Sequence, residues 1–197
     1  MNVFDVIVGM VDEGASVLDL GCDDCSLLER LHAERGVLGR GVDIDDRSIQ
    51  ACIRRGISVF HGNLDEGLKD HPSGSYDVVI LSRTLQQVRN PHLLLDEMLR
   101  VGRRVIVNFP NFGHIVNRMQ LGLGGRMPVN RNIPYSWYDT PNIHFFTQRD
   151  FHALCHERGV RIVREVFLSR GRIVPRILPN LIATEVCCLL TADETAI

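Results

Sequence analysis

The sequence lacks a long apolar segment and an excess of positive charge. Its formal net charge is -2 over 197 residues, so it has no general basic surface to neutralise phosphates, and we expect no nucleic-acid partner. The amino-terminal run has no basic start, and Asp5 and Asp12 interrupt its apolar residues. We therefore expect no signal peptide, no membrane helix and no membrane partner, which leaves a cytoplasmic location as the default expectation.

Repeats, low-complexity tracts and a G-x-S-x-G nucleophile elbow are also missing from the sequence. The missing elbow argues against acyl transfer by a serine of this chain. Hydrophobic residues make up 45% and charged residues 23% of the sequence, which is enough apolar material for a packed core. The length suits one domain over residues 1–197.

Six cysteines are present, and without a secretory signal we expect them to be reduced thiols. Cys22 and Cys25 form a C-x-x-C motif, which suits a redox pair or half of a zinc site. No second C-x-x-C follows to complete four zinc ligands, so we expect small buried thiols and no metal site.

Apolar spacing alternates between the strand and helix periods along the chain. Strands are expected at 16–20, 37–44, 57–61, 76–81, 103–108, 160–168 and 183–191. Helices are expected at 3–11, 24–35, 46–55, 93–101 and 147–158, and a further short helix is expected at 114–123. This alternation predicts an α/β fold with a doubly wound, mostly parallel seven-stranded sheet. The last two strands have no clear helix between them, so we expect the last strand to be antiparallel.

Segment 109–146 interrupts the alternation and is too long for a simple connection. It holds four of the eight prolines and seven of the twelve aromatic residues. It also leaves from the carboxyl end of an expected strand, where sheets of this class bind ligands. We therefore interpret it as an insertion that serves as a lid or a contact surface.

The strongest local indication of a ligand site is an acidic residue at or near the end of two successive expected strands. The run VLDLGC, residues 17–22, ends a buried strand in Gly21, where glycine allows a tight turn and close approach of a ligand. Asp43 ends the next strand, 22 residues after Gly21. A carboxylate at this position is placed to accept hydrogen bonds from ribose hydroxyls.

These motifs resemble those of the S-adenosylmethionine (SAM)-dependent methyltransferases, whose first motif has the form V-L-D-L-G-C-G-x-G. The resemblance implies a glycine-rich turn against the methionine part of SAM, an acid at the ribose and contacts to adenine after the third strand. A further implied position lies at the end of the fourth strand, beside the reaction site. The implied cofactor-binding residues are Asp19, Gly21, Cys22, Asp23, Asp43, Ile44, Asn63, Leu64 and Ser82.

The first motif departs from that pattern at two positions, where Asp23 and Cys25 replace glycines. A left-handed backbone costs a residue with a side chain about 1–3 kcal/mol. The Asp23 carboxylate would also repel the carboxylate of SAM. Asn63 stands where an aspartate is common. These departures predict weakened or lost SAM binding within an intact fold.

A closer resemblance, over nearly the whole chain, is to the MetW family of methionine biosynthesis. It is carried by VLDLGC, GVDID, GNLDEGL, YDVVILSRTLQQVRNP, VGRRVIVNFPNFGH, GRMPVN and PYSWYDTPNIHFFTQRDF. The resemblance implies an accessory subunit that binds and activates a homoserine O-acyltransferase of the MetX type, an α/β-hydrolase enzyme.

We therefore hypothesise a subunit without chemistry of its own that contacts its partner through the insertion. The expected partner-binding residues are Arg126, Met127, Pro128, Tyr135, Trp137, Tyr138, Asp139 and His144. An active small-molecule methyltransferase is the alternative, as is a SAM-sensing regulator of the pathway. A methyltransferase needs a general base, for which the insertion offers His114, Tyr135, Tyr138, Asp139 and His144.

Overall fold

The computed structural model describes residues 2–192, which form an eight-stranded sheet flanked by helices. The strands are β1 (Ser16–Leu20), β2 (Leu38–Asp43), β3 (Ser58–His61), β4 (Tyr76–Ser82), β5 (Gly102–Pro110), β6 (Val160–Ser169), β7 (Arg172–Val174) and β8 (Glu185–Ala192). The helices are α1 (Val3–Val8), α2 (Ser26–Arg35), α3 (Asp46–Arg54), α4 (Pro91–Val101), α5 (Ile115–Gly122), α6 (Gln148–Glu157) and α7 (Pro179–Ile182). Two 3-10 turns are η1 (Leu64–Glu66) and η2 (Leu85–Gln87).

The strand order is β3-β2-β1-β4-β5-β8-β6-β7. Pairing is parallel from β3 through to β5, and β8 is antiparallel to both β5 and β6. The predicted α/β class, the mostly parallel sheet and the antiparallel last strand are therefore confirmed. The predicted strand number is wrong, because the sheet has eight strands and not seven. β7 was missed because three residues are too few to show an alternating pattern.

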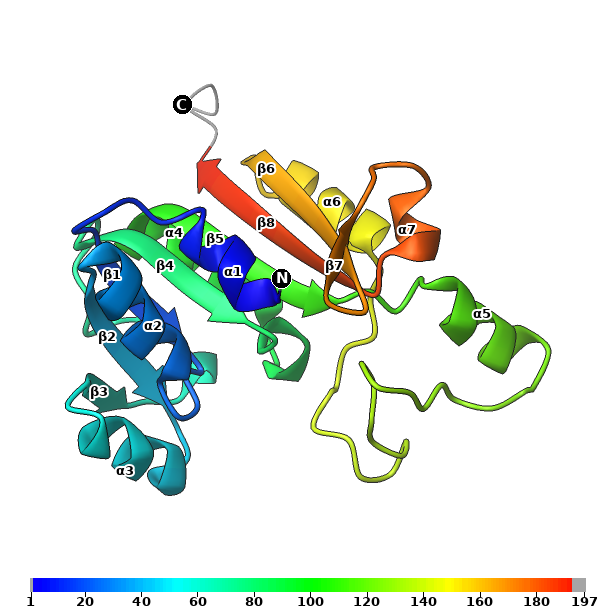
Figure 1. Cartoon of the computed structure of the whole chain (residues 1–197), viewed down its shortest axis with the longest axis horizontal. Coiled ribbons are helices and arrows are strands. Elements are labelled where there is room, and N and C mark those ends of the chain that lie inside the picture. Colours follow the sequence, from blue (N-terminus) through cyan, green and yellow to red (C-terminus); the bar gives the residue numbers. More distant parts are fainter. Residues whose placement is uncertain (1, 193–197) are drawn as a thin grey trace.

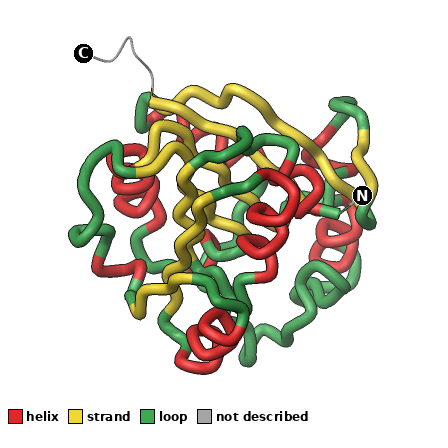
Figure 2. Tube along the Cα trace, turned by 60° about the vertical axis from the view of Figure 1, so that its left-hand side comes forward, coloured by secondary structure: helices red, strands yellow, loops and turns green. Residues whose placement is uncertain are grey.

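The sheet is covered on both faces, as the doubly wound class requires. On one face, α1, α2 and Cys52 of α3 pack against side chains such as Val17. On the other face, α4 and α6 pack against the alternate side chains, such as Leu18. Figure 2 shows the strands running between helices on the two sides. This alternation along β1 follows from the two-residue period of a strand and explains its near-continuous apolar sequence.

Beyond β5, the chain leaves the sheet through α5 and the long loop that follows it (Figure 1). An isolated bridge between Asn130 and Ile133 is the only β pairing between α5 and α6. The loop returns to the sheet where the Phe112 N–H donates to the Phe146 carbonyl at 3.1 Å. The insertion therefore begins and ends at the carboxyl end of the parallel strands.

Candidate functional site

A cavity of about 1180 Å³ lies at the carboxyl ends of β1, β2 and β4. All nine residues that the sequence predicts to bind a cofactor line this cavity: Asp19, Gly21, Cys22, Asp23, Asp43, Ile44, Asn63, Leu64 and Ser82. They come together because parallel strands bring their carboxyl ends to one edge of the sheet. Whether they bind a cofactor stays a prediction, but the fold does place them in a single site.

The turn after β1 needs glycine at its first position. Gly21 has a φ of 68°, and a Cβ added there would lie 2.6 Å from Oγ1 of Thr84. The N–H groups of Gly21 and Cys22 both donate to the Val42 carbonyl, at 2.8 and 3.2 Å. The turn is thus held to the end of β2 by the backbone, with no room for a side chain at Gly21.

The next part of the turn keeps a glycine-like backbone although the glycines are absent. Asp23 and Cys25 have φ angles of 50° and 59°, both in the left-handed region. Side chains disfavour this region by about 1–3 kcal/mol, so other contacts must hold the turn in place. The substitutions therefore leave the backbone conformation of the turn intact and add strain to it.

Asp43 connects this turn to the second strand end. Its Oδ2 accepts the Asp23 N–H at 2.9 Å, and its Oδ1 accepts the Asp45 N–H at 2.9 Å. Ile44, the next residue, is 60% exposed at the cavity wall. The carboxylate is consequently fixed in position, and each oxygen retains a lone pair for a further donor.

Asp19 differs from Asp43 in its surroundings. It is 3% exposed, and within residues 2–192 its carboxyl group accepts no hydrogen bond and forms no ion pair. Burial, and then the nearby charge of Asp43, raise the pKa of Asp19 to about 8. A buried carboxyl group without a partner at a cavity wall suits a cationic group of a ligand, such as an ammonium.

The adenine-side residues have structural roles of their own. The Asn63 side chain accepts the Asp65 N–H at 3.0 Å and donates to Glu66 at 3.3 Å, which caps η1. Leu64 packs against the core on the α4 face of the sheet. The Ser82 hydroxyl donates to Oδ1 of Asn108 at 3.4 Å. Any contact from Asn63 to a base would therefore come from its remaining lone pair and N–H, or from its backbone.

Sequence reasoning did not assign Arg83 and Thr84 to the cofactor site, although both line the cavity. Their position directly after β4 was the available signal. Arg83 pairs with Glu185 at 2.6 Å, which raises the pKa of its guanidinium. His114 also lines the cavity, and burial, followed by the charge of Arg170, lowers its pKa. Of the predicted candidate bases, His114 therefore both lines the cavity and has a lowered pKa.

The expected partner-binding residues are distributed unevenly over the insertion. Trp137 and Tyr138 are 73% and 76% exposed, and their rings meet edge to face at a centroid distance of 5.5 Å. Tyr135 is 46% exposed and lines the cavity. His144 is half-buried, and its backbone N–H donates to the Gln86 carbonyl at 3.0 Å.

The remaining residues of the predicted partner contact differ from one another in exposure. Arg126, Met127 and Asp139 are exposed, whereas Pro128 is buried. Pro128 therefore offers little accessible surface to a partner, and the role of the other residues stays a prediction. We call Arg126, Met127, Trp137, Tyr138 and Asp139 the insertion surface.

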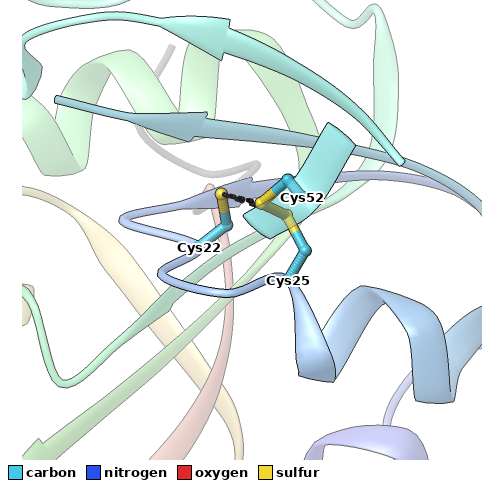
Figure 3. Close-up of side chains that lie close together, drawn as sticks. All are labelled: Cys22, Cys25 and Cys52. Carbon is cyan, nitrogen blue, oxygen red and sulfur yellow. Dashed lines mark hydrogen bonds between the residues drawn. A yellow bond between two sulfur atoms is a disulfide. The ribbon is translucent and has the colours of Figure 1, made fainter. Parts of the chain in front are cut away.

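Three cysteines meet beside the same turn, and here the expectation of reduced thiols is wrong. Cys25 and Cys52 form a disulfide, and the thiol of Cys22 lies beside it (Figure 3). The sequence offered only Cys22 and Cys25 as a candidate redox pair, whereas the fold brings Cys52 of α3 next to Cys25 across 27 residues. The other cysteines, at positions 155, 187 and 188, are buried thiols as expected.

In the described part of the chain, no helix is long and apolar enough to cross a membrane.

Comparisons with known proteins agree on family and fold. The model of the family described as "Methionine biosynthesis protein MetW" matches residues 2–190. A curated relative, the bifunctional methionine biosynthesis protein MetXA/MetW of Rhodopirellula baltica, is 37% identical over 187 residues. That match covers 89% of this chain but only 30% of the relative, so the chain spans less than a third of the relative's length.

Solved structures show the fold. A chain of the complex between the Haloferax volcanii Trm112 methyltransferase activator and a methyltransferase superposes with a TM-score of 0.69 at 14% identity, covering 98% of this chain and 99% of that chain. A SAM-dependent methyltransferase of Aquifex aeolicus superposes with a TM-score of 0.67 at 13% identity, covering 96% and 89%. The architecture is therefore the Rossmann-like fold of SAM-dependent methyltransferases.

Proposed function

Because this chain belongs to the MetW family of methionine biosynthesis, we propose that it is an accessory subunit that binds and activates a homoserine O-acyltransferase of the MetX type. The observation that carries the proposal is the relative whose name joins MetXA and MetW in one protein. A shared polypeptide holds two units at a high effective concentration, which suits units that work together. The acyl transfer itself is assigned to the partner, because this chain has no nucleophile elbow.

The insertion surface is the proposed point of contact. Large aromatic side chains bury much apolar area on association and are enriched at the energetic centres of interfaces. Trp137 is the only tryptophan of the chain and is mostly exposed. Arg126 and Asp139 supply exposed charges of both signs on the same insertion, which suits the polar rim of an interface.

The test measures association and acyltransferase activity with purified partner and full-length chain. Trp137→Ala is expected to weaken binding by about 30-fold, the size of a hot-spot residue at about 2 kcal/mol. Leu38→Ala serves as the control, because Leu38 is similarly exposed, at 71%, but lies on β2 near the far edge of the sheet. Absence of any complex at micromolar concentrations would refute the accessory role. Full affinity in both Trp137→Ala and Tyr138→Ala would refute the contact surface alone.

A second candidate function is SAM binding in the cavity, favoured by the isolated Asp19 carboxyl group. The chemistry of the residues present fits this ligand: Asp19 would hold the ammonium group, Asp43 would accept from the ribose hydroxyls, and the backbone around Asn63 and Leu64 would contact the adenine. Bound SAM would supply an activated methyl group, or it would act as an end-product signal to the partner. In the second case the coupling is reciprocal, so the partner would change the affinity for SAM by the same factor.

The test is a calorimetric titration with SAM and with S-adenosylhomocysteine. Asp43→Ala is expected to abolish binding, and Asp46→Ala, a neighbouring acid outside the cavity lining, is expected to retain it. A signal role predicts that both ligands change the activity of the acyltransferase. Methyl transfer instead predicts that SAM is consumed when an acceptor is present, with His114, which lines the cavity, as a candidate base. No binding at millimolar ligand would exclude both roles and leave the accessory proposal standing.

A further inference from the structure

The disulfide ties the turn that forms the cavity wall to a helix far along the chain. Cys25 precedes α2 and Cys52 lies on α3, and both are completely buried. The sulfur of Cys22 lies 3.4 Å from that of Cys25 and 3.8 Å from that of Cys52 (Figure 3). We call residues 21–25 the cofactor turn. Two of its side chains, Cys22 and Cys25, thus meet the sulfur of Cys52 on α3.

The cofactor turn depends on this attachment. Asp23 and Cys25 have left-handed backbones without being glycine. Such conformations persist only where surrounding contacts hold them. Asp23 is held by the hydrogen bond of its N–H to Asp43, whereas the side chain of Cys25 is held by the bond to Cys52. Cys25, which replaces a glycine of the motif, is thus the residue of the turn that the disulfide anchors.

The third cysteine does not readily exchange with the disulfide. Burial, and then the charges of Asp19 and Asp43, raise the pKa of the Cys22 thiol to about 12. Only a thiolate attacks a disulfide, so a neutral Cys22 leaves the Cys25–Cys52 bond in place. Reduction consequently requires a reductant from outside and a local opening of the turn.

A metal ion is the competing use of three sulfur atoms within 4.8 Å of one another. Tetrahedral zinc needs a fourth ligand, and within residues 2–192 no histidine or carboxylate joins the group. On the sheet side, a Cβ added at Gly41 would lie 2.4 Å from the Cys22 sulfur and 3.3 Å from that of Cys25. The backbone of β2 thus closes that side, and the arrangement favours a disulfide over a metal centre.

We propose that Cys25 and Cys52 form a reversible thiol–disulfide site that controls the cofactor turn, and with it the affinity of the cavity for an adenosyl ligand. The ligand part rests on the second candidate function above. The disulfide holds the turn in its glycine-like conformation, which is the binding-competent state. In reduction, a dithiol attacks the S–S bond through a mixed disulfide and is itself oxidised to a disulfide. Its two electrons pass to the Cys25 and Cys52 sulfurs, each of which takes up a proton.

The first experiment counts thiols in the full-length protein. Alkylation in denaturant without reductant is expected to label Cys22, Cys155, Cys187 and Cys188, and prior reduction is expected to add Cys25 and Cys52. Peptide mapping identifies the pair, and a mixture of reduced and oxidised glutathione is expected to interconvert the two forms. Failure of oxidised glutathione to form the Cys25–Cys52 bond overturns the proposal. So does a tightly held metal ion that protects all three cysteines in the native protein.

The second experiment compares the oxidised and reduced proteins by hydrogen exchange and by binding of S-adenosylhomocysteine. Reduction is expected to speed hydrogen exchange in the cofactor turn and to weaken ligand binding by about tenfold or more. This factor corresponds to the cost of returning one relaxed residue to its strained left-handed backbone when the ligand binds. Cys52→Ser should behave as the reduced form does in both buffers. Cys155→Ser, a buried thiol on α6, should keep the redox response.

The two proposals fail in different ways. If neither the oxidised nor the reduced protein binds the ligand, the SAM proposal fails. The difference in hydrogen exchange between the two proteins still tests the redox site. If exchange and affinity are the same in both forms, the redox control fails and ligand binding stands. Should Cys52→Ser not fold, titration of the unaltered protein with dithiothreitol provides the same comparison.

Discussion

At the scale of single residues, Asp19 shows how position in the fold changes the chemistry of a side chain. Its sequence position, before Gly21 at the end of a buried run, predicts a site residue. Burial, and then the neighbouring charge of Asp43, raise its pKa. Burial depends on the strands on both sides of β1, so the sequence around Asp19 alone does not reveal it.

Asp19→Asn is expected to stabilise the protein at neutral pH. The pKa of Asp19 is raised to about 8 in the folded state, so the folded protein binds a proton that the unfolded chain releases above about pH 4. Stability is therefore lost as the pH rises from about 4 to about 8, and asparagine, which mimics the protonated acid, removes this loss. Urea unfolding should show a gain of roughly 2–4 kcal/mol at pH 7 and little change near pH 4.

Asp77→Asn provides a control of opposite sign. Hydrogen bonds from the backbone and hydroxyl of Ser16 lower the pKa of Asp77. Its contribution to stability is present above its unfolded pKa and is lost as the pH falls through the folded value, so the variant should be destabilised at pH 7. Equal pH profiles for Asp19→Asn and the unaltered protein would contradict the assigned protonation of Asp19.

At the scale of elements, Asn111 connects parts of the chain that the sequence shows only as separate segments. It directly follows β5 and is 1% exposed. Its amide donates to the carbonyls of Asn180 and Ala183, at 3.2 and 2.8 Å. Its oxygen accepts the N–H groups of Gly113 and Gln148, at 3.1 and 3.2 Å. One side chain thus joins the start of the insertion to α6 and α7.

Asn111→Ala is expected to lower the free energy of unfolding by about 2–4 kcal/mol, because it leaves buried backbone groups without hydrogen bonds. Denaturant unfolding followed by circular dichroism measures the loss. Asn90→Ala is the matched control, because Asn90 is exposed and its side chain makes no capping hydrogen bond at the start of α4. A loss no larger than that of the control would show that Asn111 does not hold these elements together.

The same region explains the error in the predicted elements. The segment between β6 and β8 contains both β7 and α7, of three and four residues. Elements this short depend on contacts with neighbouring segments, since neither is long enough to repeat its period of apolar spacing and so to show a recognisable pattern. The longer elements, such as β4 and α4, carry enough apolar positions to be predicted from the sequence.

At the scale of the whole molecule, the cavity and the insertion surface are joined through one segment. Tyr135 lines the cavity on the same loop as Trp137 and Tyr138. The loop is attached to η2, at the end of β4, because the N–H groups of Ile143 and His144 both donate to the Gln86 carbonyl. The fold therefore provides a physical route by which a ligand in the cavity and a partner on the insertion could affect each other.

The sequence alone determined the α/β class, the antiparallel last strand, the family and nine of the residues that line the cavity, because these follow from local periodicity and from motifs at strand ends. The tertiary structure decided what no local pattern contains. It placed Cys52 against Cys25, buried Asp19 with no hydrogen-bond or ion-pair partner among the described residues, buried Pro128 and exposed Trp137. Each of these depends on which distant segments meet, and such meetings depend on the packing of the whole chain.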